Sequence, residues 1–191
     1  MTDARVVRTR AALHRAATRL ASERAVSAIT VSDLAAEAGI NRATFYKHYM
    51  SPNEALAAPL RDDLAVIRAR NISGAASLAT VIETLLGDTF DHIARFTDVY
   101  ATAVEQPLDG VVSNVLSEHF TDAVTRFMES HDGAVVTFES DPALTARFIG
   151  SGVAGTVEAW LRAGSSDRPS LLRAISSCLP GWAHEVRAPA R

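Results

Sequence analysis

Residues 30–56 read TVSDLAAEAGINRATFYKHYMSPNEAL and contain the start signals of three successive helices. Thr30 and Asp33 have the spacing of a capping box, in which two residues satisfy each other's free hydrogen-bonding groups. The helix that starts there is expected over residues 31–38 and should end at Gly39, because glycine tolerates the left-handed exit from a helix. The first of the three helices therefore has a defined start and a defined end.

A second helix is expected over residues 42–49, and Asn41 can cap it. Residues 51–54 (SPNE) then give a third start, with a capping serine, a proline at the first helical position and an acid in capping-box register. Two helices joined by a short glycine turn form the helix-turn-helix pattern, whose second helix enters the DNA major groove. The stretch therefore predicts DNA binding.

The second of these helices has one side for packing and another for DNA. Phe45 and Tyr49 lie one turn apart and are expected to pack on the neighbouring helices. Arg42 stands at the amino end, which contacts base edges in such motifs, and arginine can grip guanine through two hydrogen bonds. The residues expected on the DNA side are Arg42, Ala43, Thr44, Tyr46, Lys47 and His48. The alternative is an ordinary amphipathic helix whose charges are only solvated.

The charges of the chain are divided between a basic head and an acidic body. Residues 1–50 contain eight Arg or Lys against four acids, whereas residues 51–191 contain 11 Arg or Lys against 18 acids. The phosphate backbone of DNA attracts the first composition and not the second. The arginines before the helix-turn-helix either contact phosphates beside the binding site or are merely solvated.

Residues 20–56, LASERAVSAITVSDLAAEAGINRATFYKHYMSPNEAL, resemble the DNA-binding domain of TetR-family repressors, and the resemblance covers the first 56 residues. It implies a DNA-binding domain over residues 1–51 and a ligand-binding and dimerisation domain over residues 52–191. The implied helices are residues 6–24, 31–38 and 42–49, with a linking helix from Pro52. The family positions that touch DNA correspond to Ser32, Arg42, Ala43, Thr44, Tyr46, Lys47 and His48.

Three residues depart from the family pattern. Ala25 stands where glycine usually ends the first helix, and Ala21 stands where an aromatic residue usually fills the core. Pro52 replaces a common lysine, so the phosphate contact of that lysine is expected to be lost or made by the backbone. None of the three changes the helix expected to read DNA.

The rest of the sequence predicts an all-α fold. Apolar residues recur at three- and four-residue steps over residues 78–93, 112–127, 142–161 and 171–179, as they do in amphipathic helices. The run at residues 134–138 is too short to classify.

The helix expected over residues 142–163 has two apolar faces. Ile149 and Val153 lie on a bulky face, whereas the opposite face has small residues such as Gly152. A helix that is apolar on both sides is buried on both sides, so the second face is expected to meet another subunit. The family resemblance implies a four-helix dimer interface made with residues 169–179. The expected interface residues are Phe148, Gly152, Gly155, Ala159, Leu171, Leu172, Ile175 and Leu179. The alternative is a central helix in a monomeric core.

Residues 150–155 (GSGVAG) match the glycine pattern of dinucleotide-binding turns. That chemistry requires a strand before the first glycine and a second strand that ends in an acid about 20 residues on. The residues before the motif instead continue a helical pattern, and Asp167 comes too early to be that acid. The glycines are therefore expected to serve helix packing, and no cofactor is expected.

Other chemistry is sparse. His119 is either a hydrogen-bonded core histidine or a polar group in a pocket. Asp88 and His92 could share a metal ion, but two ligands without a third favour an exposed pair. The sequence has no glycine-flanked serine elbow, phosphate loop or zinc-protease motif. No catalytic residue or metal is therefore expected.

The cysteine content and the hydropathy of the chain favour a location in the cytoplasm. Cys178 is the only cysteine, and the sequence has no long apolar span.

Together these patterns predict a homodimeric transcriptional regulator, specifically a repressor that binds a palindromic operator and is released by a small ligand. Two heads about 34–36 Å apart reach successive major grooves of DNA. One alternative is a regulator that is controlled by a protein partner, or is not controlled at all, and whose closely packed body has no ligand pocket. Another alternative is an enzyme that carries a DNA-binding head.

The family resemblance implies a ligand pocket in the body. Aromatic walls with few polar groups are typical of sites for largely apolar ligands. The residues expected to line it are Phe90, Ile93, Phe96, Tyr100, Leu116, His119, Phe120 and Phe148. Phe90, Phe120 and Phe148 are expected to converge on one cavity from three helices.

Overall fold

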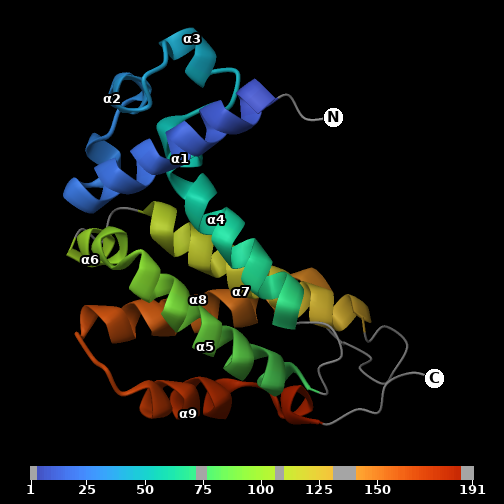
Figure 1. The fold of residues 1–191 in the computed structure, drawn as a ribbon. Helices are drawn as coiled ribbons and strands as arrows, with labels where there is room; N and C mark the ends of the chain where they lie inside the picture. The colour runs from blue at the N-terminus through green and yellow to red at the C-terminus, as the bar shows by residue number, and fades with distance from the viewer. Residues whose placement is uncertain (1–3, 72–76, 106–109, 131–140, 186–191) are drawn as a thin grey trace. The chain divides into compact units, whose positions relative to one another are not determined.

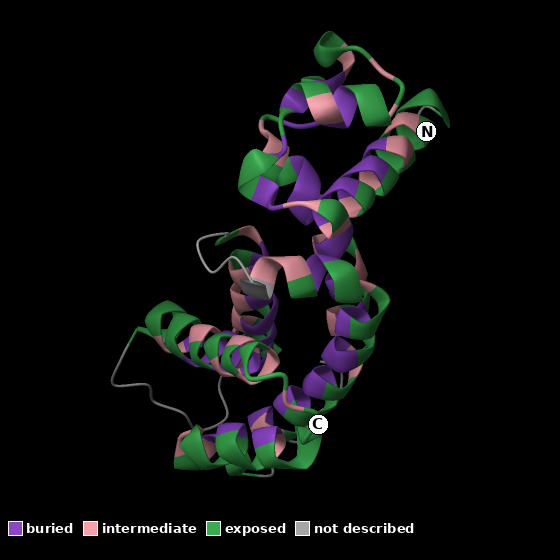
Figure 2. Ribbon diagram, turned by 90° about the vertical axis from the view of Figure 1, so that its left-hand side faces the viewer, coloured by how far each residue is buried: buried purple, intermediate pink, exposed green. Residues whose placement is uncertain are grey.

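The computed structural model describes residues 4–71, 77–105, 110–130 and 141–185, and its regular elements are all helical (Figure 1). They are α1 (Ala4–Glu23), η1 (Val26–Ala28), α2 (Val31–Glu37), α3 (Arg42–Phe45), α4 (Pro52–Asn71), α5 (Leu78–Arg95), α6 (Thr97–Glu105), α7 (Gly110–Ser130), α8 (Pro142–Arg162), α9 (Arg168–Cys178) and η2 (Gly181–His184). Figure 2 shows that the long helices carry buried and exposed positions in turn, as amphipathic helices do. The predicted all-α fold is confirmed.

The chain divides into two compact units. The first unit comprises Met1–Asp63 and Ile93–Val112, and the second comprises Leu64–His92 and Ser113–Arg191. Helices α4, α5 and α7 therefore each contribute residues to both units. The domain boundary between residues 51 and 52 stays a prediction, because it separates functions rather than compact units.

The helix-turn-helix of the first unit has the local hydrogen bonds that its sequence predicts. The Thr30 hydroxyl accepts from the Asp33 backbone N–H at 3.2 Å, and the Asp33 carboxylate accepts from the Thr30 N–H at 2.8 Å. Gly39 follows α2 with a φ of 66°, in the left-handed region that favours glycine. Leu34 of α2 and Phe45 of α3 are fully buried, which leaves the opposite sides of both helices to solvent.

Helix α3 is shorter than predicted. Its α-helical part is Arg42–Phe45, one turn in length. The N–H groups of Lys47 and His48 donate to carbonyls three residues earlier, at 3.2 and 2.9 Å, which tightens the chain into a 3₁₀-like turn. The predicted span of residues 42–49 is therefore correct at its start and wrong at its end.

Helix α6 was not predicted, and it packs against α1 within the first unit. The Phe96 N–H donates to the Ile93 carbonyl at 3.2 Å, so the end of α5 tightens and α6 starts after it. The apolar pattern of residues 78–93 correctly predicts α5 but gives no sign of this second, nine-residue helix.

The second unit contains a close approach between α7 and α8 at Gly150. A Cβ atom at this position would lie 2.4 Å from the Thr121 backbone nitrogen and 2.6 Å from its Cα. Residues 150–155 lie entirely inside α8 and follow two turns of the same helix, so they do not form a dinucleotide-binding turn. At Gly150 the packing role predicted for these glycines is confirmed. The unclassified run at residues 134–138 lies outside the described residues.

Candidate nucleic-acid interface

The residues predicted to face DNA lie on the solvent side of α2, of α3 and of the turn that follows α3. Ser32, Arg42, Ala43, Tyr46 and Lys47 are exposed, and Thr44 and His48 are half-buried. Helices α2 and α3 pack against each other, so one local structure carries all seven. We call residues 42–48 the reading segment.

The opposite side of the reading segment is anchored in the core by aromatic rings. Phe45 is fully buried and Tyr49 is 7% exposed. The ring of Phe45 lies 6.1 Å from that of Tyr49 and meets the Tyr46 ring edge-on at 5.6 Å. The Asn41 side-chain oxygen accepts from the Thr44 N–H at 2.8 Å and so fixes the start of α3. The packing predicted for Phe45 and Tyr49 is confirmed.

The cations of the reading segment differ in their partners from two arginines of α1. Arg10 and Arg19 of α1 pair with Asp62 and Glu37, at 2.7 and 2.6 Å. Among the described residues, no carboxylate pairs with Arg42 or with Lys47. Arg8 and Arg15 of α1 are likewise exposed without a carboxylate pair in the described part of the chain, so positive charge available to phosphate lies on the reading segment and on part of α1.

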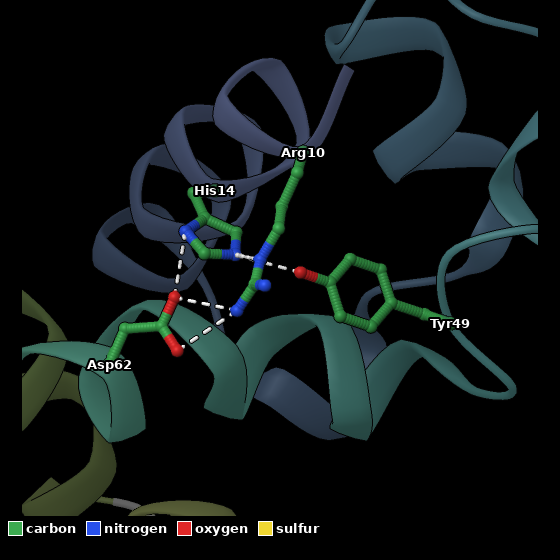
Figure 3. A network of polar contacts seen from close by, with 4 residues as sticks. All are labelled: Arg10, His14, Tyr49 and Asp62. Carbon is green, nitrogen blue, oxygen red and sulfur yellow. Dashed lines mark hydrogen bonds and ion pairs between the residues drawn. The ribbon is translucent and has the colours of Figure 1, made fainter. Parts of the chain in front are cut away.

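A polar network that no local sequence pattern predicts joins α1, α4 and the residue that follows the reading segment (Figure 3). The Tyr49 hydroxyl lies 2.7 Å from Nε2 of His14, and Arg10 donates two hydrogen bonds to the Asp62 carboxylate at 2.9 and 2.7 Å. The Asp62 carboxylate also lies 3.9 Å from Nδ1 of His14. Helix α1 therefore contacts α4 through Arg10, and it contacts Tyr49, the residue after the reading segment, through His14.

Burial sets the protonation of the two aromatic members of this network. It lowers the pKa of His14 below its ordinary value, an effect that Asp62 opposes and Arg10 reinforces. Burial likewise raises the pKa of Tyr49. Near neutral pH the pair therefore consists of a neutral imidazole and a neutral phenol.

The residues predicted to line a ligand pocket do not form one group. Ile93, Phe96 and Tyr100 belong to the first unit. The other five, Phe90, Leu116, His119, Phe120 and Phe148, belong to the second unit. Within the second unit, Phe90 packs on Trp160 with ring centres 5.2 Å apart, and the Arg168 guanidinium lies 4.6 Å from the same ring.

The prediction that Phe148 converges on Phe120 in a buried cavity is wrong. Phe120 is fully buried, whereas Phe148 is 81% exposed. Phe148 lies on the same side of α8 as Gly152 and Gly155, which are also exposed, while Ile149 is buried on the core side. The helical period that places Phe148 with the glycines also turns it away from the core.

His119 is a core histidine with both ring nitrogens in contact with polar groups. It is fully buried in α7, with Nδ1 3.0 Å from Arg68 Nη1 and Nε2 3.3 Å from the Thr89 hydroxyl. Its pKa is lowered to about 3, first by burial and then by the charge of Arg68. Arg68 also approaches Asp122 at 3.4 Å, and its Nε is buried without a hydrogen-bond partner among the described residues.

Asp88 and His92 do not form the exposed pair that the sequence pattern predicts. His92 is fully buried, and Asp88 accepts a hydrogen bond from the Asn71 side chain at 2.8 Å. The described residues contain no group of three potential metal ligands.

The face of α8 predicted to meet another subunit is open to solvent in the single chain. Phe148, Gly152, Gly155 and Ala159 are all exposed, and Cβ atoms added to either glycine would contact nothing. A groove of about 660 Å³ adjoins this face, and its apolar walls come from α8, α9 and η2. The residues that line it include Leu144, Phe148, Ile149, Ile175, Leu179 and Trp182.

Two residues predicted for the interface are already buried within the single chain. Leu171 and Ile175 are each only 4% exposed within a single chain. They stand one turn apart on the buried side of α9, which packs against α8. Leu172 and Leu179 are half-buried and retain surface for a partner.

Residues 13–54 match the family model described as bacterial regulatory proteins, tetR family. The structure is similar to the fatty acid degradation regulator FadR from Bacillus halodurans, with 16% identity, a TM-score of 0.60 and coverage of 92% of this chain and 96% of that one. It is also similar to the repressor AlkX from Dietzia sp., with 19% identity, a TM-score of 0.56 and coverage of 95% and 99%. The dihydroxyacetone kinase operon activator DhaS is similar as well, with 18% identity, a TM-score of 0.53 and coverage of 88% of this chain and 90% of that one. No curated protein matches the sequence.

A helix-turn-helix whose reading side is exposed and positively charged is typical of transcriptional regulators that bind DNA, and this chain is of that class. More narrowly, residues 13–54 match the sequence pattern of the TetR family, and the chain has the same fold as AlkX, a TetR-family repressor. Among the described residues, no helix is long and apolar enough to cross a membrane.

Proposed function

We propose that the chain acts as a homodimer that binds a palindromic operator, with one reading segment in each of two successive major grooves. The observation that carries the proposal is the pair of cations, Arg42 and Lys47, which are exposed on the reading segment and have no carboxylate partner in the described part of the chain. Arg42 is assigned to a base edge and Lys47 to phosphate. Ser32, Thr44, Tyr46 and His48 add hydrogen-bonding groups on the same side, and Ala43 allows close approach.

The second subunit is proposed to pack on the open face of α8. Phe148, Gly152, Gly155 and Ala159 expose apolar surface that adjoins the 660 Å³ groove. Contiguous apolar surface of this kind marks interaction sites, and the exposed glycines permit close approach of a partner helix. Two reading segments on one dimer match the two halves of a palindrome.

The regulation is proposed to be repression that a small, largely apolar ligand relieves. By their descriptions, FadR is a regulator of fatty acid degradation and AlkX is implicated in the biodegradation of n-alkanes, which agrees with an apolar ligand. Binding would shift the population of head positions away from the spacing of the operator. The second candidate is activation of transcription. The observation that favours it is the similarity of the fold to DhaS, which is described as an operon activator. In a further alternative the body binds no ligand, and the regulator is controlled by a protein partner or is not controlled at all.

The test is selection of duplexes from a random-sequence library with the full chain. The expected result is a palindrome with half-sites about one helical turn apart, bound by one dimer as measured by sedimentation. A selected site without two-fold symmetry, bound by a monomer, would contradict the proposal. Melting of the same protein with a library of apolar metabolites then tests the ligand, because a ligand that binds the native state raises its apparent stability.

A further inference from the structure

We propose that His14 and Tyr49 are positioning residues for DNA recognition, and that the hydrogen bond between them holds the reading segment in the orientation that the cognate sequence requires. The inference rests on the proposed role of residues 42–48 in reading DNA. It concerns two side chains that face away from the DNA, so neither is assigned a contact with a base or a phosphate.

The reading segment depends on contacts from outside itself for its orientation. Helix α3 has a single helical turn, and a helix this short is not stable by its own hydrogen bonds. Its direction is therefore set by the side chains that anchor it. Phe45 supplies an apolar anchor within the helix, and Tyr49 is the buried residue directly after the reading segment.

The two anchors, Phe45 and Tyr49, differ in how closely they define the orientation of the reading segment. An apolar ring in a core is held by packing that has little direction, whereas a hydrogen bond fixes both distance and angle. The Tyr49 hydroxyl lies 2.7 Å from His14 Nε2 in a part-buried environment, so this bond limits how residues 46–48 turn relative to α1. The exposed groups of Tyr46, Lys47 and His48 are carried on that turn.

The surroundings of His14 fix the direction of this bond. Its Nδ1 faces the Asp62 carboxylate at 3.9 Å, which favours a proton on Nδ1 and leaves Nε2 as an acceptor for the Tyr49 hydroxyl. Arg10 Nε lies 3.5 Å from the same Nε2, so a proton on that nitrogen would face a cation. Arg10 in turn binds Asp62 through two hydrogen bonds, which orients the carboxylate toward His14 (Figure 3).

The ion pair itself contributes little to stability, because Arg10 and Asp62 are each 52% exposed. The His14–Tyr49 bond is the better shielded part of the network. A change confined to this bond should therefore alter the orientation of the reading segment while the fold of the head persists.

The experiment compares Tyr49→Phe, His14→Leu, His14→Gln and the double variant His14→Leu/Tyr49→Phe with the wild type. Each full-length protein is titrated with the duplex selected by the wild type and with a scrambled duplex of equal length. Tyr49→Phe removes only a hydroxyl, and His14→Gln keeps an acceptor near the position of Nε2. Melting curves confirm that each variant is folded at the temperature of the titration.

We expect Tyr49→Phe and His14→Leu each to bind the selected duplex about fivefold more weakly, the effect of one lost neutral hydrogen bond. Binding to the scrambled duplex should stay within about twofold of the wild type, because phosphate contacts dominate it. His14→Gln should recover most of the loss. The double variant should be no weaker than either single variant, since both remove the same bond.

Two results would overturn the inference while leaving the proposed function intact. The first is wild-type preference for the selected duplex in Tyr49→Phe and His14→Leu. The second is equal loss on both duplexes together with additive effects in the double variant, which would assign the pair to fold stability alone. If the wild type selects no sequence at all, the proposed function and this inference both fail.

Discussion

Arg68 donates a hydrogen bond to Nδ1 of His119 across 3.0 Å, and this contact fixes the tautomer of a fully buried histidine. Because a guanidinium can only donate, Nδ1 must be the acceptor and the ring proton must lie on Nε2. Nε2 then donates to the Thr89 hydroxyl at 3.3 Å, and that hydroxyl donates to the Leu85 carbonyl at 2.7 Å. The chain of bonds accounts for both nitrogens only while the imidazole is neutral.

The first prediction is that His119 makes the protein sensitive to acid. Its pKa is about 3 in the folded chain against 6.5 for an unperturbed histidine, so between these values the unfolded state binds a proton that the folded state does not. The stability of the fold therefore falls as the pH is lowered from 6.5 toward 3, by up to about 1.4 kcal/mol per pH unit from this group. Urea unfolding at pH 7.5, 6 and 5 measures the slope.

The matched variant is His119→Gln, which keeps an acceptor for Arg68 but does not titrate in this range. Its free energy of unfolding should depend less steeply on pH than that of the wild type at the same protein concentration. His14, whose pKa is also lowered, is present in both proteins and cancels in the comparison. Identical slopes for the two proteins would remove His119 as the cause.

The second prediction separates base reading from phosphate binding. Arg42→Ala should cost about 1–3 kcal/mol on the selected duplex and relax the preference at one symmetric base pair. Lys47→Ala should weaken binding to all sequences alike and lower the salt dependence by about one unit per head. Titration of both variants against single-base variants of the selected duplex distinguishes them. Equal loss on every sequence for Arg42→Ala would show that this arginine only holds phosphate.

The head could be predicted from the sequence because its signals are local. The Thr30–Asp33 box, the Gly39 exit and the Asn41 cap each depend on hydrogen bonds or dihedral angles within four residues. The His14–Tyr49 bond joins residues 35 apart, and the Arg68–His119 bond joins residues 51 apart. Pairs of this kind exist only after helices pack, so no local pattern indicates them.

Phe148 illustrates why one of the residues predicted for the pocket was placed on the wrong side of its helix. The sequence shows that Phe148 is apolar and shares a face with Gly152, but it does not show which of the two faces of α8 meets the core. That choice is made by packing, since Gly150 lets α7 approach one side of the helix. The same reasoning applies to Leu171 and Ile175, which are buried on the side of α9 that packs against α8.

The third prediction concerns the contact between α7 and α8. Gly150→Ala would place a Cβ within 2.6 Å of Thr121 backbone atoms, which cannot move without shifting α7. We expect a loss of about 1–3 kcal/mol in the free energy of unfolding, as for other overpacked cores. The control is Gly87→Ala, at an exposed position in α5 where an added Cβ would contact nothing. That change should be neutral or should stabilise α5 by up to about 1 kcal/mol, because alanine favours helices.

The last prediction tests the dimer. Gly155→Leu adds a bulky side chain to the open face of α8, where it would contact nothing within its own chain. The fold of the single chain should therefore persist, as judged by its helical circular dichroism. Sedimentation should show monomers, and affinity for the selected palindrome should fall steeply because two linked heads bind far better than one. Gly87→Leu makes the same change on the exposed side of α5 and should leave both the dimer and its affinity unchanged. If Gly155→Leu remains dimeric with full affinity, the subunits meet through another surface, and the exposed apolar face of α8 requires a different occupant.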